Sequence, residues 1–271
     1  MFTISDTEFK ILTEYIRKNY GINIKDEKRV ILTGRLRSVL TQKNFNNFHE
    51  YYKYVISDKT GEAVNTLIDR ITINHTFFMR EADHFYFFRD KILPRLADTV
   101  KDRDLRIWSA GCSTGEEPYT LAMILYDYFE KERLWWDTKV LATDISGRAL
   151  DKAKKGIYKN EAIEALPSIW RLKYFKKYDD SKCVLDDRIK REVIFRKFNL
   201  MDEVFPFKRK FHVVFCRNVM IYFDSKTREI LANKLYKFIE HGGYLFIGHS
   251  ESLDKNTSKF KYIGNAIYYK E

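Results

Sequence analysis

Two adjacent acids follow a glycine turn in the segment RIWSAGCSTGEEPY, residues 106–119. Gly111 and Gly115 allow a tight turn and a close approach to the backbone, and the proline after the acids suits the first turn of a helix. A phosphate-binding turn normally presents helix amides, often with a lysine. Glu116 and Glu117 would repel a phosphate, so the segment predicts a neutral or cationic ligand with hydroxyl or ammonium donors. The alternative is a tight turn capped by acids that favour a helix start.

Another acid, Asp144, ends a predicted strand with the sequence KVLATD. In dinucleotide-binding folds, an acid at the end of this strand accepts hydrogen bonds from ribose hydroxyls. The turn reads GCSTG and not GxGxxG, which disfavours nicotinamide and flavin cofactors. S-adenosylmethionine remains, because its sulfonium and ammonium groups suit a pocket that is lined by acids and binds no phosphate. The alternative is that Asp144 only caps the helix that begins near Ser146.

Strands that alternate with helices from about Leu105 onward would position these acids. The alternation predicts a doubly wound α/β sheet, in which a ligand binds across the carboxyl ends of the strands. Asp144, Asn199 and the pair Arg217 and Asn218 each follow a predicted strand, so we expect them to meet at one edge. The predicted strands are LRIWSAG, KVLATD, EVIFRKFN, FHVVFCRN and YLFIGHS.

The first part of the chain, residues 1–72, has helical periodicity and is predicted to form a small helical domain. Its first helix begins at Ser5 or Asp6 and ends at Gly21. Four apolar residues of a second helix, over about residues 26–41, are expected on one face: Val30, Ile31, Leu36 and Leu40. Four basic residues are expected on its other face: Lys28, Arg29, Arg35 and Arg37.

Composition limits the class of protein. The 271 residues are 45% hydrophobic, which is enough for a core, and no apolar run approaches the roughly 20 residues that span a bilayer. The N-terminus lacks a signal peptide, so we expect a cytoplasmic protein with no membrane insertion. Cys112, Cys183 and Cys216 form no CxxC pair, so neither a disulfide nor a metal site is expected. The net charge of +11 suggests an acidic partner or simply a solvated surface.

The chain resembles the chemotaxis receptor methyltransferases of the CheR family in five segments: INHTFFMRE, RIWSAGCSTGEEPYTLAM, LATDIS, FCRNVMIYFD and GGYLFIGHSE. These segments occur in the family's order and span nearly the whole chain. One departure is Met79, which stands where the family usually has a second phenylalanine. Because this change is apolar for apolar, we expect it to adjust packing and to leave Arg80 in place.

The resemblance implies a class I S-adenosylmethionine-dependent methyltransferase fold. A helical domain of residues 1–72 would be followed by a linker with helices, residues 73–104, and by the α/β catalytic domain, residues 105–271. Between about residues 168 and 191 the alternation is interrupted, and RLKYFKKY, KCVLD and EVIFRKF are predicted strands of a small antiparallel β insertion. Some family members use this subdomain to bind a receptor's C-terminal peptide; the alternative is a hairpin that covers the sheet edge.

The resemblance also implies the residues that bind S-adenosylmethionine. Glu117 would bind the amino group of the methionine moiety and Asp144 the ribose. Asn199 and Leu200 would flank the adenine. Arg217 and Asn218, which follow the fourth strand, would form the floor of the cofactor pocket. The full set of cofactor-binding residues is Asn74, Thr76, Arg80, Gly111, Glu117, Asp144, Asn199, Leu200, Arg217 and Asn218.

The implied reaction is the formation of glutamyl methyl esters on the cytoplasmic helices of chemoreceptors. A glutamate with a pKa near about 4.3 is already a nucleophile at neutral pH, so the reaction needs no general base and no metal. Positioning and exclusion of water must then provide most of the catalysis. We assign Arg80 to orienting the carboxylate and Tyr222 to a further hydrogen bond, in a protein expected to be a monomer.

Two other functions stay open. A nucleic-acid methyltransferase would explain the charge of +11. However, the [DN]PP[YFW] motif is missing and Cys216 lacks a preceding proline, so no nucleic-acid partner is expected. A noncatalytic signalling module that only binds S-adenosylmethionine is the other alternative, against which Arg80 and Tyr222 both argue.

Overall fold

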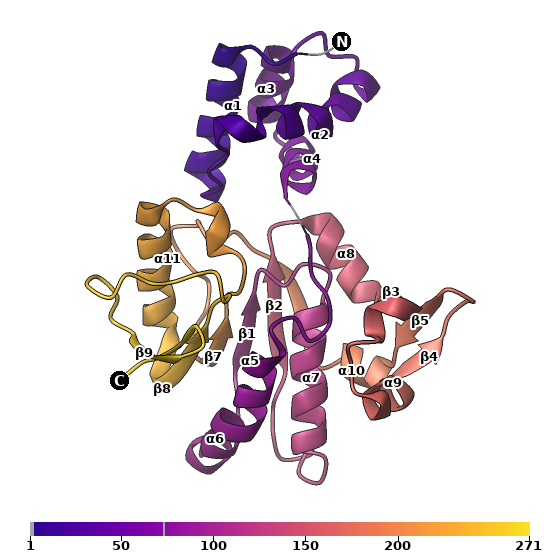
Figure 1. Cartoon of the computed structure of the whole chain (residues 1–271), viewed down its shortest axis with the longest axis vertical. Coiled ribbons are helices and arrows are strands. Elements are labelled where there is room, and N and C mark those ends of the chain that lie inside the picture. The colour runs from indigo at the N-terminus through magenta and orange to yellow at the C-terminus, as the bar shows by residue number, and fades with distance from the viewer. Residues whose placement is uncertain (1–2, 73) are drawn as a thin grey trace.

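A computed structural model describes residues 3–72 and 74–271, so residues 1–2 and Ile73, where the predicted linker begins, lie outside the described residues. A helical domain sits above a larger α/β domain, with a small β-subdomain at its side (Figure 1). Within the described residues, no helix is long and apolar enough to cross a membrane.

Four helices form the N-terminal domain: α1 (Asp6–Tyr20), α2 (Arg29–Gln42), α3 (Phe48–Ser57) and α4 (Glu62–Ile71). Ser5 caps α1 in a capping box with Glu8, and Gly21 ends the helix with a φ of +71°. A 3-10 turn, η1 (Asp26–Lys28), leads into α2. The apolar faces of the four helices meet in a core of their own.

The apolar face of α2 differs from the prediction. Val30 and Ile31 are 81% and 53% exposed, so their assignment to the buried face was wrong. The buried residues of α2 are Leu32, Leu36, Val39 and Leu40, which share one side of the helix. Residues 30 and 31 come one to two positions before this stripe and therefore face solvent.

The predicted basic face of α2 is also divided. Arg29 pairs with Asp26 at 2.6 Å and with Asp6, while Nη1 of Arg35 donates to the carbonyl of Ile71 at 2.9 Å. Two of the four cations are therefore engaged within the domain, and Arg35 is turned toward the junction with the α/β domain.

The segment after the N-terminal domain packs on the sheet as α5 (Ala82–Phe87), η2 (Phe88–Ile92, a π turn) and α6 (Leu93–Thr99). Phe85 and Phe88 lie 6.1 and 5.8 Å from the ring of Phe215, which stacks on Phe246 at 4.2 Å. This aromatic cluster anchors the segment that carries Arg80 to the centre of the sheet.

The main sheet confirms the predicted doubly wound α/β class. Its strands run in the order β6-β2-β1-β7-β8-β10-β9, and the first five are parallel. All five predicted strands are present among them. The strands are β1 (Ile107–Ala110), β2 (Val140–Asp144), β6 (Val193–Lys197), β7 (Phe211–Phe215), β8 (Ile239–Phe246), β9 (Lys261–Gly264) and β10 (Ile267–Tyr269).

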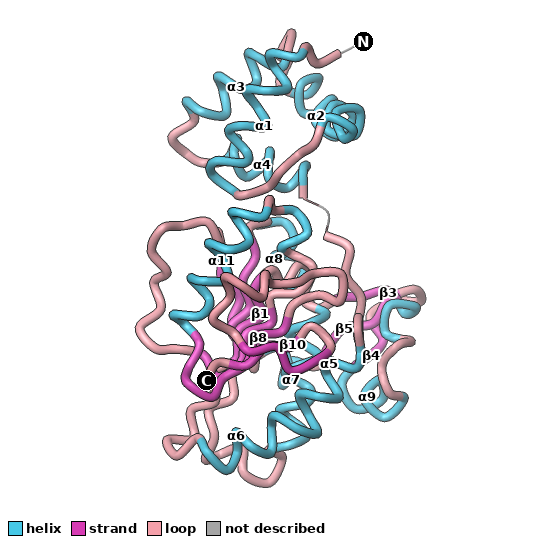
Figure 2. The backbone as a smooth tube through the Cα atoms, turned by 60° about the vertical axis from the view of Figure 1, so that its left-hand side comes forward, coloured by secondary structure: helices cyan, strands magenta, loops and turns pink. Residues whose placement is uncertain are grey.

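Helices cover both faces of this sheet, whose strands run through the middle of the domain (Figure 2). The connecting helices are α7 (Glu116–Tyr128), α8 (Gly147–Lys155) and α11 (Ser225–Phe238). Ala110 pairs with Thr143, and Asp144 pairs with Lys197, so the carboxyl ends of β1, β2 and β6 meet at one edge. The chain leaves β1 toward β2 on one side while β7 lies on the other, which makes this edge a switch point.

The small sheet is built differently from the prediction. Its strands are β3 (Ile157–Lys159), β5 (Lys182–Leu185) and β4 (Phe175–Lys177), in that order. The segment KCVLD contains β5, as predicted, and RLKYFKKY is divided, because its first half belongs to α9 (Ser168–Tyr174) and its second half contains β4. The segment EVIFRKF belongs to the main sheet as β6. Two short helices, η3 (Asn160–Ile163) and α10 (Asp187–Lys190), complete the β-subdomain.

Asp127, near the end of α7, holds the β-subdomain to the main sheet. It accepts hydrogen bonds from Nε1 of Trp170 at 2.7 Å, from Nζ of Lys173 at 2.8 Å and from the hydroxyl of Tyr174. Three side chains of α9 therefore converge on one carboxylate.

We expect Asp127→Ala to lower the free energy of unfolding by about 2–3 kcal/mol, because the donors of Trp170 and Tyr174 lose their acceptor. Urea denaturation followed by circular dichroism measures this. Asp180→Ala is the control, since Asp180 is 99% exposed and pairs only with Lys177. Equal midpoints for the two variants would show that the Asp127 cluster does not stabilise the fold.

Candidate active site

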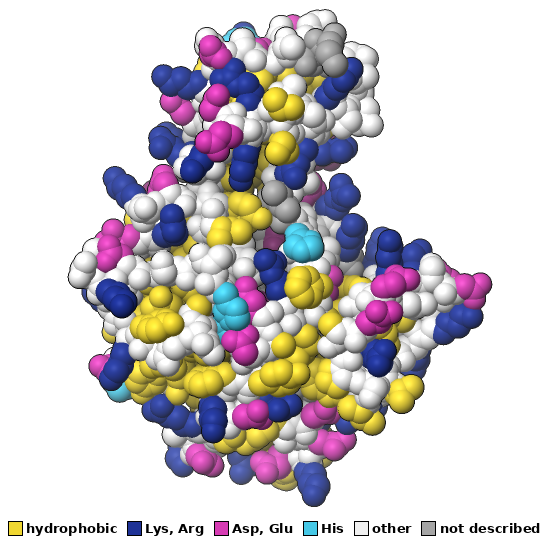
Figure 3. Space-filling model, viewed as in Figure 1, with side chains coloured by type: hydrophobic (Ala, Val, Ile, Leu, Met, Phe, Trp, Pro, Cys, Tyr) yellow, Lys and Arg dark blue, Asp and Glu magenta, His cyan; other side chains and the backbone are white. Residues whose placement is uncertain are grey.

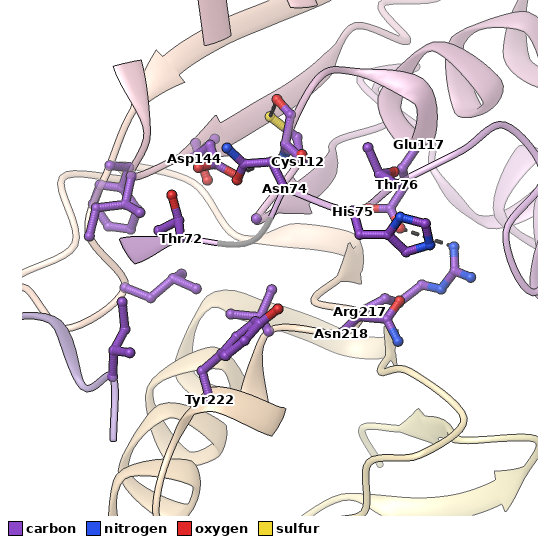
Figure 4. A pocket seen from close by; sticks show the side chains of 18 of the residues that line it. Thr72, Asn74, His75, Thr76, Cys112, Glu117, Asp144, Arg217, Asn218 and Tyr222 are labelled. Carbon is purple, nitrogen blue, oxygen red and sulfur yellow. Dashed lines mark hydrogen bonds and ion pairs between the residues drawn. The ribbon is translucent and has the colours of Figure 1, made fainter. Parts of the chain in front are cut away.

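A pocket of about 140 Å³ lies at the carboxyl edge of the parallel strands and is lined in part by residues of the N-terminal domain. Figure 4 shows that its polar side chains come from several segments and that Asp144 and Tyr222 lie on opposite sides of the pocket. The pocket brings together all eleven residues that the sequence proposed for cofactor binding or catalysis: Asn74, Thr76, Arg80, Gly111, Glu117, Asp144, Asn199, Leu200, Arg217, Asn218 and Tyr222.

A buried guanidinium forms one wall of the pocket. The side chain of Arg217, which follows β7, is 2% exposed and its Nη1 lies 3.0 Å from Oε2 of Glu117. The other carboxylate oxygen of Glu117 accepts a hydrogen bond from the hydroxyl of Ser109 at 2.7 Å. Burial raises the pKa of Glu117, and the guanidinium of Arg217 acts against that rise.

Glu81 is the second partner of Arg217 and was not among the site residues predicted from the sequence. Nη2 of Arg217 lies 3.0 Å from Oε2 of Glu81 and also donates to the carbonyl of Arg80. The amide of Asn218 donates to Oε1 of Glu81 at 3.1 Å. Burial acts to raise the pKa of Glu81, but Arg217 and Asn218 keep it below its ordinary value. The available signal was the acid that follows Arg80 in INHTFFMRE.

Backbone conformation fixes the direction of Arg80. Met79 and Glu81, on either side of it, both have left-handed conformations with φ of +60° and +54°. Met79, the residue that departs from the family pattern, is buried in the core. Nη1 of Arg80 donates to the carbonyl of His75 at 2.7 Å, and the guanidinium lies 6.0 Å from the ring of Phe77.

Asp144 links the glycine turn to the start of α8. Its Oδ2 accepts from the backbone N–H of Ser113 at 2.8 Å, and Oδ1 from that of Ser146 at 2.9 Å. Ser146, whose hydroxyl accepts from Ala149, is itself the N-cap of α8, so Asp144 is not that cap. Burial raises the pKa of Asp144, while the backbone hydrogen bonds of Ser146 and Ser113 oppose the rise.

The hydroxyl of Ser113 is a buried polar group that a ligand could satisfy. It has no hydrogen-bond partner within the described residues, and it lies in the pocket lining beside Asp144. The two oxygens of Asp144 together have about four lone-pair sites, so the carboxylate keeps capacity for a further donor beside the backbone N–H groups of Ser113 and Ser146. This part of the pocket therefore fits ligand hydroxyls.

The wall near Asn199 is mainly apolar. Its side-chain oxygen accepts from the N–H of Met201 at 3.0 Å, and its amide donates to the carbonyl of Asn19 at 2.8 Å, so the amide is already in use. Leu200 is buried, and Phe198 lines the pocket next to it. A flat, apolar ring system would fit against this wall.

Tyr222, at the end of η4 (Met220–Tyr222), points its hydroxyl into the pocket (Figure 4). Burial raises its pKa, with Arg80 and Arg35 acting in the opposite direction, so the hydroxyl is protonated at neutral pH and can donate. Its carbonyl accepts from the N–H of Asn23 at 2.8 Å, which connects this residue to the N-terminal domain.

Other residues that line the pocket were not predicted from the sequence. The N-terminal domain contributes Tyr20, Ile22, Ile71 and Thr72, for which no sequence motif gave a signal because domain docking creates the contact. The remaining unpredicted residues that line the pocket are His75, Phe77, Phe85, Cys112, Ser113, Thr143, Ile145, Phe198, Val219 and Phe223.

Two family models cover almost the whole chain. The model described as "CheR methyltransferase, all-alpha domain" matches residues 7–72, and "CheR methyltransferase, SAM binding domain" matches residues 74–269. The α/β domain is therefore an S-adenosylmethionine-binding methyltransferase domain.

Full-length relatives agree with this match. The chemotaxis protein methyltransferase of Borreliella burgdorferi is 44% identical over 270 residues, which cover 98% of this chain and 95% of that protein. The proteins with the same name from Vibrio parahaemolyticus and Escherichia coli are 34% and 33% identical; they align with 96% and 98% of this chain, over 94% and 91% of their own lengths. The chain belongs to the CheR methyltransferase family.

Proposed function

We propose that the protein transfers the methyl group of S-adenosylmethionine to glutamate side chains of chemoreceptor cytoplasmic domains, forming glutamyl methyl esters. One observation carries this proposal: the pocket is lined by two acids, Glu117 and Asp144, and also by a cation and a phenol, Arg80 and Tyr222. The first pair suits a cationic ligand with hydroxyls, and the second pair suits an anionic acceptor. The relatives named as chemotaxis protein methyltransferases support the choice of acceptor.

The acids would hold the polar parts of the cofactor. Asp144, with the unpartnered hydroxyl of Ser113, would bind the ribose hydroxyls, and Glu117 would accept from the amino group of the methionine moiety. Leu200, with the segment that carries Asn199, would flank the adenine. When bound, S-adenosylmethionine supplies an electrophilic methyl group.

Three further residues would shape the cofactor site. Asn74 and Thr76 line the pocket from the segment between the domains. Gly111 has a φ of +89°, and a Cβ atom there would lie 2.4 Å from Cγ2 of Val219. The position therefore excludes any side chain and allows the β1 turn to approach the loop after β7.

Arg217 and Asn218 are positioning residues in this proposal. The guanidinium of Arg217 is shared between Glu81 and Glu117, which leaves it little freedom to bind substrate. The guanidinium of Arg217 holds the carboxylate of Glu117 on one side and the backbone carbonyl of Arg80 on the other. The amide of Asn218 reinforces the same contact through Glu81.

Arg80 and Tyr222 would act on the acceptor. A receptor glutamate with an ordinary pKa is ionised at neutral pH, so these residues need only orient it. The guanidinium of Arg80 has one hydrogen bond, to the carbonyl of His75, and keeps donors for a carboxylate. Too tight a contact would stabilise the ground state, so the geometry of Arg80 matters more than its charge.

The positive charge of the chain does not by itself favour a nucleic-acid substrate. On the visible face of the molecule, acidic side chains are interspersed among the lysines and arginines (Figure 3). The only cations that line the described pocket are Arg80 and Arg217, and the latter is neutralised by two carboxylates. A protein carboxylate fits this pocket better than a polyphosphate chain.

We expect Asp144→Asn to weaken binding of S-adenosylmethionine by about 10- to 100-fold, because hydrogen bonds from the ribose to a charged acceptor contribute roughly 1.5–3 kcal/mol. Isothermal titration calorimetry measures the affinity. Asp151→Asn, at an exposed position of α8, is the matched control. Unchanged affinity in a folded Asp144 variant would remove this residue from the cofactor site.

We expect Arg80→Ala to lower the single-turnover rate at saturating cofactor about 100-fold, since loss of the orienting contact misplaces the acceptor. Tyr222→Phe should lower the same rate about 10-fold, because it removes one hydrogen bond to the acceptor. Calorimetry should show nearly unchanged cofactor affinity for both. Arg89→Ala, which removes a surface ion pair with Asp90, is the control. A fully active Arg80 variant would exclude Arg80 from the mechanism.

The acceptor itself is tested with methyl-labelled S-adenosylmethionine and purified chemoreceptor cytoplasmic fragments. We expect label on the receptor that alkali releases as methanol, because carboxyl esters are base-labile and N-methyl groups are not. Receptor fragments with the modified glutamates changed to alanine are the control and should take up no label. Base-stable label, or equal labelling of the control fragment, would contradict ester formation on glutamate.

A further inference from the structure

Three potential metal ligands lie together beside the pocket: Glu81, which also binds Arg217, and the two histidines His84 and His249. One ligand atom from each lies within 4.8 Å of the others. Glu81 immediately precedes α5, His84 lies within it, and His249 follows β8. Two segments that are far apart in the sequence therefore meet at this point, next to the carboxylate that Arg217 binds.

The buried ring of His84 exposes a lone pair toward this group. Its side chain is completely buried, and Nε2 lies 2.6 Å from the carbonyl oxygen of Asn265. A carbonyl can only accept a hydrogen bond, so Nε2 carries the proton and Nδ1 carries a lone pair. Nδ1 has no hydrogen-bond partner within the described chain, and it faces Oε2 of Glu81 at 3.6 Å. Two acceptors that face each other need a cation or a donor between them.

The ring of His249 also has one nitrogen next to an acceptor, which leaves the other nitrogen available to an ion. Its Nε2 lies 3.1 Å from Oδ2 of Asp83, a carboxylate placed to hold the proton on that nitrogen and to leave Nδ1 free. Metal-binding histidines typically donate their second N–H to a carboxylate or a backbone carbonyl, and these two rings have one of each. The side chain of His249 is 44% exposed, which gives an ion access from solvent.

The charges around the group also favour a cation. Glu81, Glu117 and Asp83 contribute three negative charges, and Arg217 contributes one positive charge, which leaves a local charge of about −2. A divalent ion would balance this charge. Oε2 of Glu81 accepts from both Nε and Nη2 of Arg217, while Oε1 accepts from the amide of Asn218 and keeps a lone pair for an ion.

We propose that Glu81, His84 and His249 bind one divalent transition-metal ion, of the class that includes Zn²⁺, Ni²⁺ and Co²⁺. Two imidazoles and a carboxylate form the ligand set of many zinc sites, and a solvent molecule would complete the coordination. The ion would join the start of α5 to the loop after β8. No metal was expected from the sequence, because none of the cysteines forms a CxxC pair and these three ligands come from separate segments.

Zinc binding to the full-length, chelator-treated protein tests the proposal without any activity measurement. In competition with a chromophoric chelator, we expect one equivalent of Zn²⁺ to bind, and His249→Ala to weaken binding by at least about 100-fold. His241→Ala removes an exposed histidine outside the group and should leave the affinity unchanged. The absence of stoichiometric binding, or equal losses in both variants, would overturn the proposal.

The wild-type protein also reports on the buried ligand, so no core variant is needed. Long-range ¹H–¹⁵N NMR of the imidazoles should show that Nδ1 of His84 shifts with the first equivalent of Zn²⁺, while Nε2 stays protonated. Zinc binding without any change at His84 would mean that the exposed pair of His249 and Asp83 binds ions on its own. That result would also contradict the three-ligand site.

Discussion

The geometry of the pocket depends on one buried guanidinium, that of Arg217, which two carboxylates share. Glu81 and Glu117 each lie 3.0 Å from it, and their side chains are only 15% and 14% exposed. Loss of the guanidinium would leave buried negative charges without compensation, which costs more than the ion pairs themselves contribute. One side chain therefore holds three segments in a fixed relation: the approach to α5, the first turn of α7 and the loop after β7.

A second buried acid extends this constraint to Tyr222. Glu251, in the segment GGYLFIGHSE, accepts from the backbone N–H groups of Gly248, Asn218 and Ile221 at 2.6, 2.9 and 3.0 Å. Glu251 thus holds the loop that begins with Arg217 near its start and near its end. The loop in turn sets the direction of the Tyr222 hydroxyl. Tyr222, which we propose to orient the acceptor carboxylate, is therefore positioned by Glu251, an acid that does not line the pocket.

Local sequence patterns predicted what depends on local structure. The five parallel strands were recognisable because each is a short apolar run, and the polar residues after them meet because parallel strands share their carboxyl edge. The errors came from tertiary context. Val30 was assigned to the core although the buried stripe of α2 begins at Leu32, and EVIFRKF pairs with β2 instead of the small sheet. Glu81 follows Arg80 in the same motif but was not assigned, because its partner Arg217 lies 136 residues away in the sequence.

The N-terminal domain closes the pocket through contacts with the same segments that carry the predicted cofactor residues. Asn23 donates to the carbonyl of Tyr222, the carbonyl of Asn19 accepts from Asn199, and the hydroxyl of Ser146 donates to Asp69 at 2.6 Å. A ligand that orders these segments would stabilise docking of the domain, and docking would in turn favour the ligand by the same free energy. In the proposed reaction, a carboxylate and a sulfonium lose their opposite charges as they meet, so exclusion of water by the docked helical domain would favour methyl transfer.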